Sequence, residues 1–385
     1  MRLFTKPLEK EMIEWRHDFH KNPELGFQEF ETSKKIVGLL QTFGIKVFKN
    51  FGKTGVVGIL DRGISRKTIA LRADMDALPI MENTGLKYSS INKNTMHACG
   101  HDGHMAMLLG AAKFLASDPD YGGRIFFIFQ PNEENGLGAK AMIKKGLFSK
   151  FQIDEIYALH NLPGMSIGQF ATKENVITAS ESCFEVEIIT AGGHSALPNL
   201  GPDAIVIASE IISALQTIVS RKIDPRKKAV FSITEIFSNG KRNVLPSSVT
   251  LKGDTRTIDK TVKDLIKVHF KKIVKGVCFA HGATAKIKFK TYFPVTVNSK
   301  TATQNVVRCI SESFGSNNLN YNCEAMPFSE DFSHMASQCP ACFILMGNGM
   351  NGVNGQPLHS PKFDFCDDGL IQGSSLWVNL AKQSN

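Results

Sequence analysis

Residues 124–130 read RIFFIFQ, and this almost continuous apolar run is the clearest indication of the fold in the 385-residue chain. Such a run is typical of a strand that is buried on both faces, as in a parallel sheet covered by helices. Pro131 and Asn132 follow, and then the carboxylates of Glu133 and Glu134. Adjacent glutamates usually lie on a solvated surface, but this pair comes directly after a core strand.

Similar runs alternate with helical patterns through the first part of the chain. The predicted elements are helices at 8–22 and 32–43 and strands at 56–60, 68–72 and 155–159. Asp102 is expected to cap a further helix that runs to about Ser117. The alternation predicts an α/β sandwich with a largely parallel central sheet.

Polar residues follow three of the predicted strands. Asp74 and Asp76 follow one strand, the Glu133 and Glu134 pair follows another, and His160 ends a third. In open α/β sheets, ligands bind in the crevice beyond the carboxyl ends of the strands. We therefore expect these side chains to line one site.

The segment MHACGHDGH at 96–104 supplies the strongest candidate metal ligands. Cys99 and His101 flank a glycine, so a bent backbone can turn both side chains toward one point. A structural zinc site has four closely spaced ligands, whereas the further candidates here, Glu134, His160 and His359, are scattered along the chain. This dispersal favours a catalytic cleft with open coordination positions.

These five residues have the chemistry of a dinuclear centre. Two divalent ions about 3.5–4 Å apart need around five protein ligands, one of them bridging, and the Cys99 thiolate can bridge. The set suits manganese or zinc, with cobalt or nickel as further candidates.

Two neighbouring carboxylates have further predicted roles. Asp76 can orient a ligand histidine. Glu133 is free to take a proton from water while Glu134 binds metal, so the predicted reaction is hydrolysis of a carbonyl compound, most simply an amide.

The middle of the chain has a different order of predicted strands and helices, which indicates a second domain. Its order is βαββαβ, the ferredoxin-like split motif. The predicted elements are strands at 184–190, 229–237, 249–258 and 285–292 and helices at 203–220 and 260–280. We expect an inserted lid domain at 182–292 and a metal-binding catalytic domain made of 1–181 and 293–385.

Three residues of this insert are candidates for substrate contact. His194 lies on the glycine-rich turn AGGHSA at 191–196, Asn243 lies in a connection, and Arg256 lies on the strand that follows. Hydrolysis of an N-acyl amino acid needs an oxyanion donor and a carboxylate clamp. His194 is assigned a catalytic part, and all three are predicted to bind substrate. A surface arginine is an equally good interpretation of Arg256.

Composition narrows the class of protein. The formal net charge is +9 and the sequence pI is about 9.0, but the lysines are spread along the chain rather than clustered with aromatic residues, which argues against a nucleic-acid partner. The first residues lack an apolar core for a signal peptide, and no run approaches the roughly 20 apolar residues of a membrane span. Eight scattered cysteines suit a reducing compartment. We predict a cytoplasmic protein without membrane contact.

These segments resemble the co-catalytic metallopeptidase and aminoacylase family, in its subgroup of hippurate hydrolases, auxin-conjugate hydrolases and N-acetyldiaminopimelate deacetylases. The matching segments are HKNPELGFQE at 20–29, GKTGVVGIL at 52–60, LRADMDALP at 71–79, MHACGHDGH at 96–104, FQPNEENGLGAKAMI at 129–143, ALHNLPG at 158–164, GGHSALP at 192–198 and SEDFS at 329–333. The resemblance implies a phosphorylase/hydrolase-like α/β sandwich with an inserted lid. It also implies two divalent ions per subunit and a homodimer or homotetramer formed through the lid.

The resemblance implies roles for particular residues as well. Metal ligands are implied at Cys99, His101, Glu134, His160 and His359, with Glu133 as the general base. His194 and Asn243 are implied to bind the substrate carbonyl and the oxyanion, with the lid histidine coming from the partner subunit in dimeric relatives. Arg256 matches the carboxylate-binding arginine by its spacing from Asn243. The chain departs from the pattern at Asn132, where relatives often have alanine.

The predicted substrate is an N-acyl amino acid such as N-benzoylglycine or an N-acetyl amino acid. An N-acetyldiaminopimelate deacetylase or a dipeptidase of the same family is the alternative within this chemistry. From another class, a cysteine amidase would use Cys99 as nucleophile with His101 or His160 as base. A non-catalytic binding protein on the same scaffold would have lost Glu133 or ligands, and none is lost. A nucleic-acid binder would show steep salt dependence.

Overall fold

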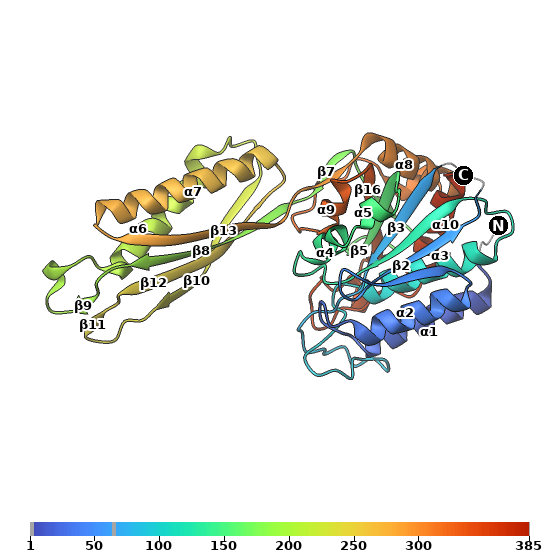
Figure 1. Ribbon diagram of the computed structural model, residues 1–385, viewed down its shortest axis with the longest axis horizontal. Coiled ribbons are helices and arrows are strands. Elements are labelled where there is room, and N and C mark those ends of the chain that lie inside the picture. Colours follow the sequence, from blue (N-terminus) through green and yellow to red (C-terminus); the bar gives the residue numbers. More distant parts are fainter. Residues whose placement is uncertain (1–3, 64–66, 385) are drawn as a thin grey trace. The chain divides into compact units, whose positions relative to one another are not determined.

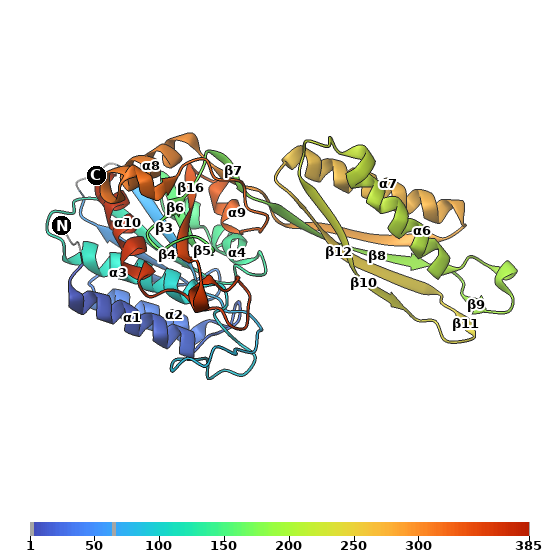
Figure 2. The same cartoon turned by 180° about the vertical axis from the view of Figure 1, so that it is seen from behind.

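The computed structural model describes residues 4–63 and 67–384 and divides them into two compact units (Figures 1 and 2). The first unit consists of Met1–Ile177, Thr296–Glu324 and Asp331–Asn385. The second consists of Thr178–Val295 and Ala325–Glu330. The predicted insert, 182–292, lies wholly within the second unit, which also takes in a short segment from near the end of the chain.

A mixed sheet of eight strands forms the centre of the first unit, in the order β1-β2-β4-β3-β5-β16-β6-β15. The strands are β1 Lys46–Phe51, β2 Gly55–Asp61, β3 Thr68–Asp74, β4 Arg124–Gln130, β5 Glu155–Pro163, β6 Phe170–Ala171, β15 Leu319–Asn320 and β16 Ala341–Gly349. The neighbours β4, β3, β5 and β16 are parallel, and β1 and β2 are antiparallel additions at one edge. A short ladder of β7 Asn175–Thr178 with β14 Thr296–Asn298 lies apart from this sheet.

The parallel strands are the buried centre of the fold. β3 and β16 are buried along their whole length, and β4 is buried from Ile125 to Gln130. Continuous burial of this kind requires cover on both faces of a sheet. The apolar run at 124–130 is therefore a core strand, as the sequence predicts.

Helices supply that cover. Those of the first unit are α1 Lys6–Lys21, α2 Phe30–Thr42, α3 His101–Ser117, α4 Gly138–Lys144, α5 Leu147–Lys150, α8 Lys300–Phe314, α9 Phe332–Ala336 and α10 Gly369–Gln383, with 3-10 turns η3 Ser316–Asn318 and η4 Gly352–Gly355. α3 packs against β3 and is flanked by α1 and α10 (Figure 1). Its side chains are buried over most of its length, which makes it the central helix of the core.

Two local predictions are corrected in this unit. Asp102 does not cap α3, because the N-cap residue is Gly100 with a φ of 92° and α3 starts at His101. The Asp102 carboxylate instead accepts hydrogen bonds from Arg16 and His20 of α1. His160 does not end its strand, because pairing with β16 continues beyond Leu345 and carries β5 on to Pro163.

The second unit is an antiparallel sheet in the order β10-β12-β8-β13, with α6 and α7 lying on one of its faces (Figures 1 and 2). Its elements are β8 Ser180–Ile189, β9 Gly193–His194, η1 Pro198–Leu200, α6 Ala204–Thr217, η2 Ile218–Lys222, β10 Ala229–Ser238, β11 Val244–Leu245, β12 Ser248–Thr257, α7 Lys260–Ala280 and β13 Thr284–Phe293. The longer elements follow the predicted βαββαβ order. Its own core includes Phe184, which lies against Phe231 and Phe270.

One helical stretch of this unit is long and apolar enough, by length and composition only, to cross a membrane. It runs from Ala204 to Lys222. Within the structure, Ile207, Ile211 and Leu215 on one side of α6 are buried in the core of the second unit. That periodicity is typical of a helix packed on a sheet.

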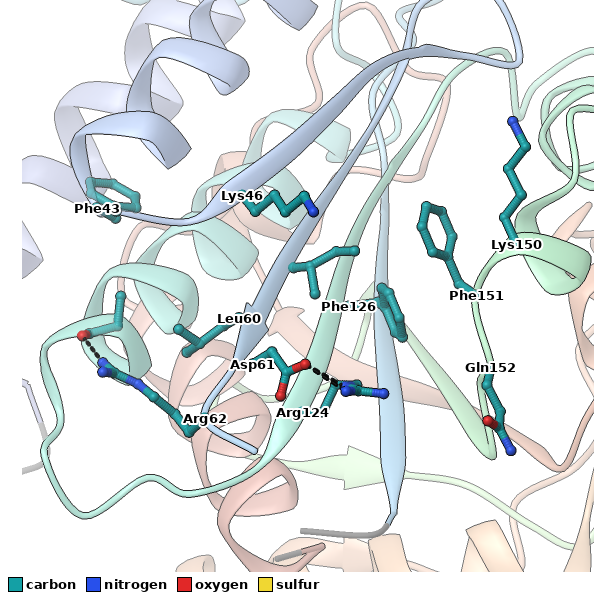
Figure 3. Close-up of a pocket in the computed structure, with 13 residues that line it drawn as sticks. Phe43, Lys46, Leu60, Asp61, Arg62, Arg124, Phe126, Lys150, Phe151 and Gln152 are labelled. Atoms are coloured by element: carbon teal, nitrogen blue, oxygen red, sulfur yellow. Dashed lines mark hydrogen bonds and ion pairs between the residues drawn. The ribbon is translucent and has the colours of Figure 1, made fainter. Parts of the chain in front are cut away.

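A cavity of about 810 Å³ lies in the first unit where β4 begins (Figure 3). Its lining includes the cations Lys46, Arg62, Arg124 and Lys150. The guanidinium of Arg124 is paired with Asp61 at 2.6 Å, and Arg62 donates to the backbone oxygen of Ala116 at 2.6 Å (Figure 3). Both arginines are thus held by the fold. The cavity lies at the opposite end of β4 from the Glu133 and Glu134 pair.

Candidate metal centre and active site

The first unit brings all five predicted metal ligands into one cluster, in which three are buried, Glu134 is partly buried and His359 is exposed. Cys99 and His101 lie at the start of α3, Glu134 follows β4, His160 lies in β5, and His359 lies in the loop after η4. Residues of two parallel strands, β4 and β5, thus meet the start of α3, because the carboxyl ends of parallel strands lie at one edge of the sheet.

The ligand atoms fall into two groups that share one thiol. The atoms of Cys99, His101 and His160 lie within 4.8 Å of one another, and so do those of Cys99, Glu134 and His359. The shortest contacts are 3.4 Å from Cys99 Sγ to His160 Nε2 and 3.4 Å from His359 Nε2 to Glu134 Oε1. Two donor groups that share one thiol fit a pair of adjacent divalent ions.

Unsatisfied atoms point into this cluster. Within the described part of the chain, His101 Nε2 and Glu134 Oε1 are buried and make no hydrogen bond, although Glu134 Oε1 lies 3.4 Å from His359 Nε2 as an ion-pair contact. The other ring nitrogen of His101, Nδ1, is hydrogen bonded at 2.8 Å to the backbone oxygen of Asp76. Buried polar atoms nearly always have partners, so these two atoms are placed to bind a cation.

The charges around the cluster lead to the same conclusion. Burial lowers the pKa of His101, but the carboxylates of Asp74, Asp76 and Glu134 outweigh it and raise the pKa to about 10. Burial, with the charges of Glu134 and Glu133, raises the pKa of the Cys99 thiol well above its usual value. The site therefore has an excess of negative charge that favours a positive ion, and a bound cation would favour the thiolate. The donor set fits divalent metal ions.

The ring of His160 is held with one nitrogen toward Cys99. Its Nδ1 is hydrogen bonded at 2.8 Å to the backbone oxygen of Asn161, which leaves Nε2 facing Cys99. Burial and the nearby charge of His104 lower the pKa of His160 to about 3. A neutral imidazole held by its other nitrogen is the usual state of a histidine ligand.

Asp76 organises the two glutamates. Its Oδ1 accepts from the backbone N–H of Glu133 at 2.9 Å, and its Oδ2 accepts from that of Glu134 at 3.1 Å. Asp76 was predicted to orient a ligand histidine. The shorter contact to His101 is made by its backbone oxygen, while its carboxylate lies 3.5 Å from the ring.

Glu133 lies beside the ligand cluster and is 6% exposed. Its Oε1 accepts from the backbone N–H of Asp331 at 3.2 Å. The ligand atoms of His101, Glu133 and Glu134 all lie within 4.8 Å of one another. Its carboxylate is thus within reach of a water or a substrate atom held at the cluster.

A second buried network, which includes Asp74 and His104, lies next to this cluster. Asp74 accepts from Arg72 at 2.7 Å and lies 2.6 Å from His104 Nδ1. His104 Nε2 lies 2.8 Å from Asn161 Oδ1. The spacing of His101 and His104 along one helix face is a signal for this network. The network continues to Asp331, which accepts from Arg72 at 3.3 Å and from Gln130 at 2.6 Å. No local pattern predicts these pairings, because Asp331 is far from both residues in the chain.

The predicted lid residues belong to the second unit, where two of them lie together. His194 of β9 is paired with Val244 of β11, and the backbone oxygen of Asn243 accepts from Ser195 at 3.2 Å. His194 and Asn243 are both exposed. A positive φ at Gly192, 67°, turns the chain from β8 into this hairpin.

Arg256 lies elsewhere in the same unit. It is bound at 2.9 Å to Glu181 and at 2.8 Å to Asp254, near the end of β12. β12 starts at Ser248, beside the His194 hairpin, and the eight residue steps from there to Arg256 span about 26 Å at ~3.3 Å per residue. The second unit therefore does not bring Arg256 together with His194 and Asn243.

The chain is similar to known proteins, in sequence and in structure, over nearly its whole length. A model of peptidase family M20/M25/M40 matches residues 70–383. Hippurate hydrolase of Campylobacter jejuni is 40% identical over 374 residues, which cover 97% of this chain and 96% of the relative. N-acetylcysteine deacetylase of Bacillus subtilis is 35% identical, with coverage of 98% and 97%.

Among solved structures, a dinuclear metal binding peptidase of the M20 family from Bacillus subtilis matches with a TM-score of 0.84. It is 31% identical, and the match covers 98% of each chain. The fold, the clustered donor set and these similarities agree. The chain belongs to peptidase family M20/M25/M40.

Proposed function

We propose that this protein is a metal-dependent amidohydrolase that cleaves N-acyl amino acids to a carboxylic acid and a free amino acid. The observation that carries the proposal is the pair of donor groups sharing Cys99, with Glu133 beside them. The similarity to hippurate hydrolase and to N-acetylcysteine deacetylase supports this substrate class, because the names of both relatives describe cleavage of an N-acyl amino acid.

Two divalent ions are proposed to bind Cys99, His101, Glu134, His160 and His359. Manganese and zinc suit this donor set best, and cobalt or nickel also fit. Bound there, the ions would supply Lewis acidity to polarise the amide carbonyl and lower the pKa of a water molecule.

Glu133 is proposed as the general base. It takes a proton from the attacking water and returns it to the leaving amine nitrogen. This role requires a carboxylate that is held in a fixed position and is not itself bound to a metal ion. The hydrogen bonds to Asp76 and Asp331 hold the residue at its backbone and at its side chain. A positioned base of this kind contributes about 10²–10⁴-fold to the rate.

His194 and Asn243 are proposed to bind the substrate carbonyl, and Arg256 its carboxylate. A dipeptide-sized substrate spans about 7 Å when extended, so it cannot touch both ends of β12, which are about 26 Å apart. If one substrate contacts both His194 and Arg256, the two side chains come from different subunits. We therefore propose a homodimer in which His194 acts on the partner's site.

The second unit has a surface suited to such a dimer. β10 is an edge strand, and its Ile236 and Phe237 are 59% and 54% exposed. Ile205 and Val206 of α6 are also more than 45% exposed. An unpaired strand edge with exposed apolar side chains favours pairing with a second copy. Dimerisation through this unit is proposed, with a homotetramer as the larger form.

The cysteine amidase alternative is less well supported. A nucleophilic thiol needs a lowered pKa and access to substrate, whereas Cys99 is buried among carboxylates that raise its pKa. That mechanism also gives no role to Glu134 and His359.

Eight free cysteines, together with the absence of any disulfide among the described residues, support a cytoplasmic location.

A hydrolysis screen with the metal-loaded protein tests the proposal. N-benzoylglycine, N-acetyl amino acids, N-acetyldiaminopimelate and a dipeptide are compared with added manganese, zinc or cobalt. Release of the free amino acid, its loss on chelation and its return on metal addition are expected. Activity that survives complete metal removal would favour the cysteine amidase, and no turnover of any N-acyl compound would overturn the proposed function.

A further inference from the structure

The turn that carries Glu133 and Glu134 is held by two buried carboxylates rather than one. Asp76 binds the backbone N–H groups of Glu133 and Glu134. The preceding N–H, that of Asn132, donates at 2.9 Å to Oε1 of Glu29. Three consecutive amides of one tight turn thus each have a carboxylate acceptor. Three hydrogen bonds from consecutive backbone amides to side-chain oxygens hold the turn at its main chain.

Glu29 is free for this task because another residue caps its helix. It stands at the N-cap position of α2, where a carboxylate ordinarily binds the first-turn amides, yet its side chain makes no cap hydrogen bond. Glu24 does so instead, accepting from the N–H groups of Glu31 and Thr32 at 3.2 and 2.8 Å. The Glu29 carboxylate is therefore directed at the turn after β4.

Glu29 links three separate segments in the core. Its Oε2 accepts from the Thr54 hydroxyl, between β1 and β2, at 2.5 Å, while its Oε1 holds Asn132. Glu29 is fully buried, and burial, with the charge of Asp76, raises its pKa to about 7. Burying a carboxylate costs free energy, so a structural role alone would be met more cheaply by a neutral side chain.

The turn itself needs such an anchor. Asn132 has a φ of 49°, in the left-handed region that asparagine tolerates better than most residues. Its side-chain oxygen accepts from Asn135 at 2.5 Å, and a Cβ added at Gly26 would meet that oxygen at 1.8 Å. The Asn132 side chain is thus packed against the loop that leads to Glu29.

We infer that Glu29 is a positioning residue for the proposed general base, acting through the backbone of Asn132. Glu133 and Glu134 have different tasks one residue apart, so a small shift of the turn displaces both. A misplacement of about 1 Å can cost ~10²-fold in rate. This inference rests on the proposed function for its kinetic readout, but its structural readout does not depend on activity.

The test compares Glu29→Ala and Glu29→Gln in the full-length, metal-loaded protein, with Glu31→Gln of the exposed face of α2 as the matched control. Glu29→Ala should lower kcat by at least ~10-fold, with KM and metal content nearly unchanged. Glu29→Gln should recover to within about threefold, since its amide oxygen can accept from Asn132 while its amide N–H donates to Thr54. A role limited to stability would move the melting temperature and the active fraction, but not kcat per active site.

Hydrogen–deuterium exchange of the peptide 129–137 is the second readout. Glu29→Ala should speed exchange at Asn132, Glu133 and Glu134, and Glu31→Gln should not. If Glu29→Ala does not fold, Thr54→Val removes one partner of Glu29 and should cause a smaller change in the same direction. Wild-type kcat and wild-type exchange in these variants would overturn the inference. If the wild-type protein cleaves no N-acyl amino acid, the proposed function fails and the exchange rates alone decide the role of Glu29.

Discussion

The Sγ atom of Cys99 lies 3.4 Å from Nε2 of His160, although the residues are 61 positions apart in the chain. Cys99 comes just before α3 and His160 lies in β5, so the contact depends on how that helix start meets the sheet edge. The thiol also belongs to the group that contains Glu134 and His359. A residue common to both groups should affect both ions when it is lost.

Cys99→Ala should therefore reduce metal occupancy as well as activity. A bridging thiolate holds two ions, and removal of a ligand weakens binding to a site that the fold has built around it. Metal content is measured by elemental analysis after dialysis, with Cys183→Ala in the second unit as the control. Full occupancy of both sites in an inactive Cys99→Ala protein would favour the nucleophile interpretation.

Glu133→Gln should have the opposite signature. The substitution removes the proton acceptor but keeps the shape of the side chain and its contact with the Asp331 amide. We expect kcat to fall by about 10²–10⁴-fold while metal content stays near that of the wild type. Empty metal sites in this variant would show that Glu133 is a ligand and that the roles of the pair are reversed.

His194→Ala should lower kcat by about 10²–10³-fold, the usual effect of losing one oxyanion donor. Metal content and thermal stability should stay unchanged, because His194 is exposed and lies outside the core cluster of the second unit. Wild-type kcat in this variant would remove His194 from the mechanism.

Mixing inactive His194→Ala and Glu133→Gln subunits tests whether His194 acts across a dimer. A hybrid dimer has one site with both groups intact if His194 comes from the partner subunit, so part of the activity should return. A chain that supplies His194 to its own site would show no recovery. Sedimentation analysis of the mixture confirms that hybrid dimers have formed.

His20 predicts how stability depends on pH. Burial lowers its pKa, but hydrogen bonds to Asp102 and Glu82 outweigh burial and raise the pKa to about 9, against 6.5 for the unperturbed side chain. The folded state therefore binds this proton more tightly than the unfolded chain. The resulting stabilisation, at most about 3.4 kcal/mol for the difference 9 − 6.5, is complete below pH 6.5 and is lost as the pH rises through 9.

Urea unfolding between pH 6 and pH 10 measures this effect. Trp15 and Trp377 both lie in the first unit, so tryptophan fluorescence reports the unit that contains His20. His20→Gln should flatten the fall in unfolding free energy between pH 6.5 and 9, and His281→Gln, on the exposed surface of the second unit, should not. The same slope in all three proteins would contradict the assignment.

The sequence alone was sufficient to predict those features that depend on residues close together in the chain. The apolar run of β4 and the alternation of strands and helices predict an α/β sheet, because burial on both faces leaves a continuous apolar pattern. The ligands near Cys99 and the glutamates after β4 are likewise visible as short motifs. Their position at strand ends predicts convergence, since parallel strands end at one edge.

Tertiary structure decided what depends on register and on distant segments. The binding of the Asn132 amide by Glu29 joins positions 103 apart, and no local pattern marks either as a partner of the other. Asp102 has the residue type of a helix cap, yet it serves Arg16 and His20 because α1 packs against α3. The separation of His194 from Arg256 follows from the ten-residue length and pairing of β12. Such contacts form only when strands and helices are assembled, because hydrogen-bond register and packing, rather than local propensity, set which side chains meet.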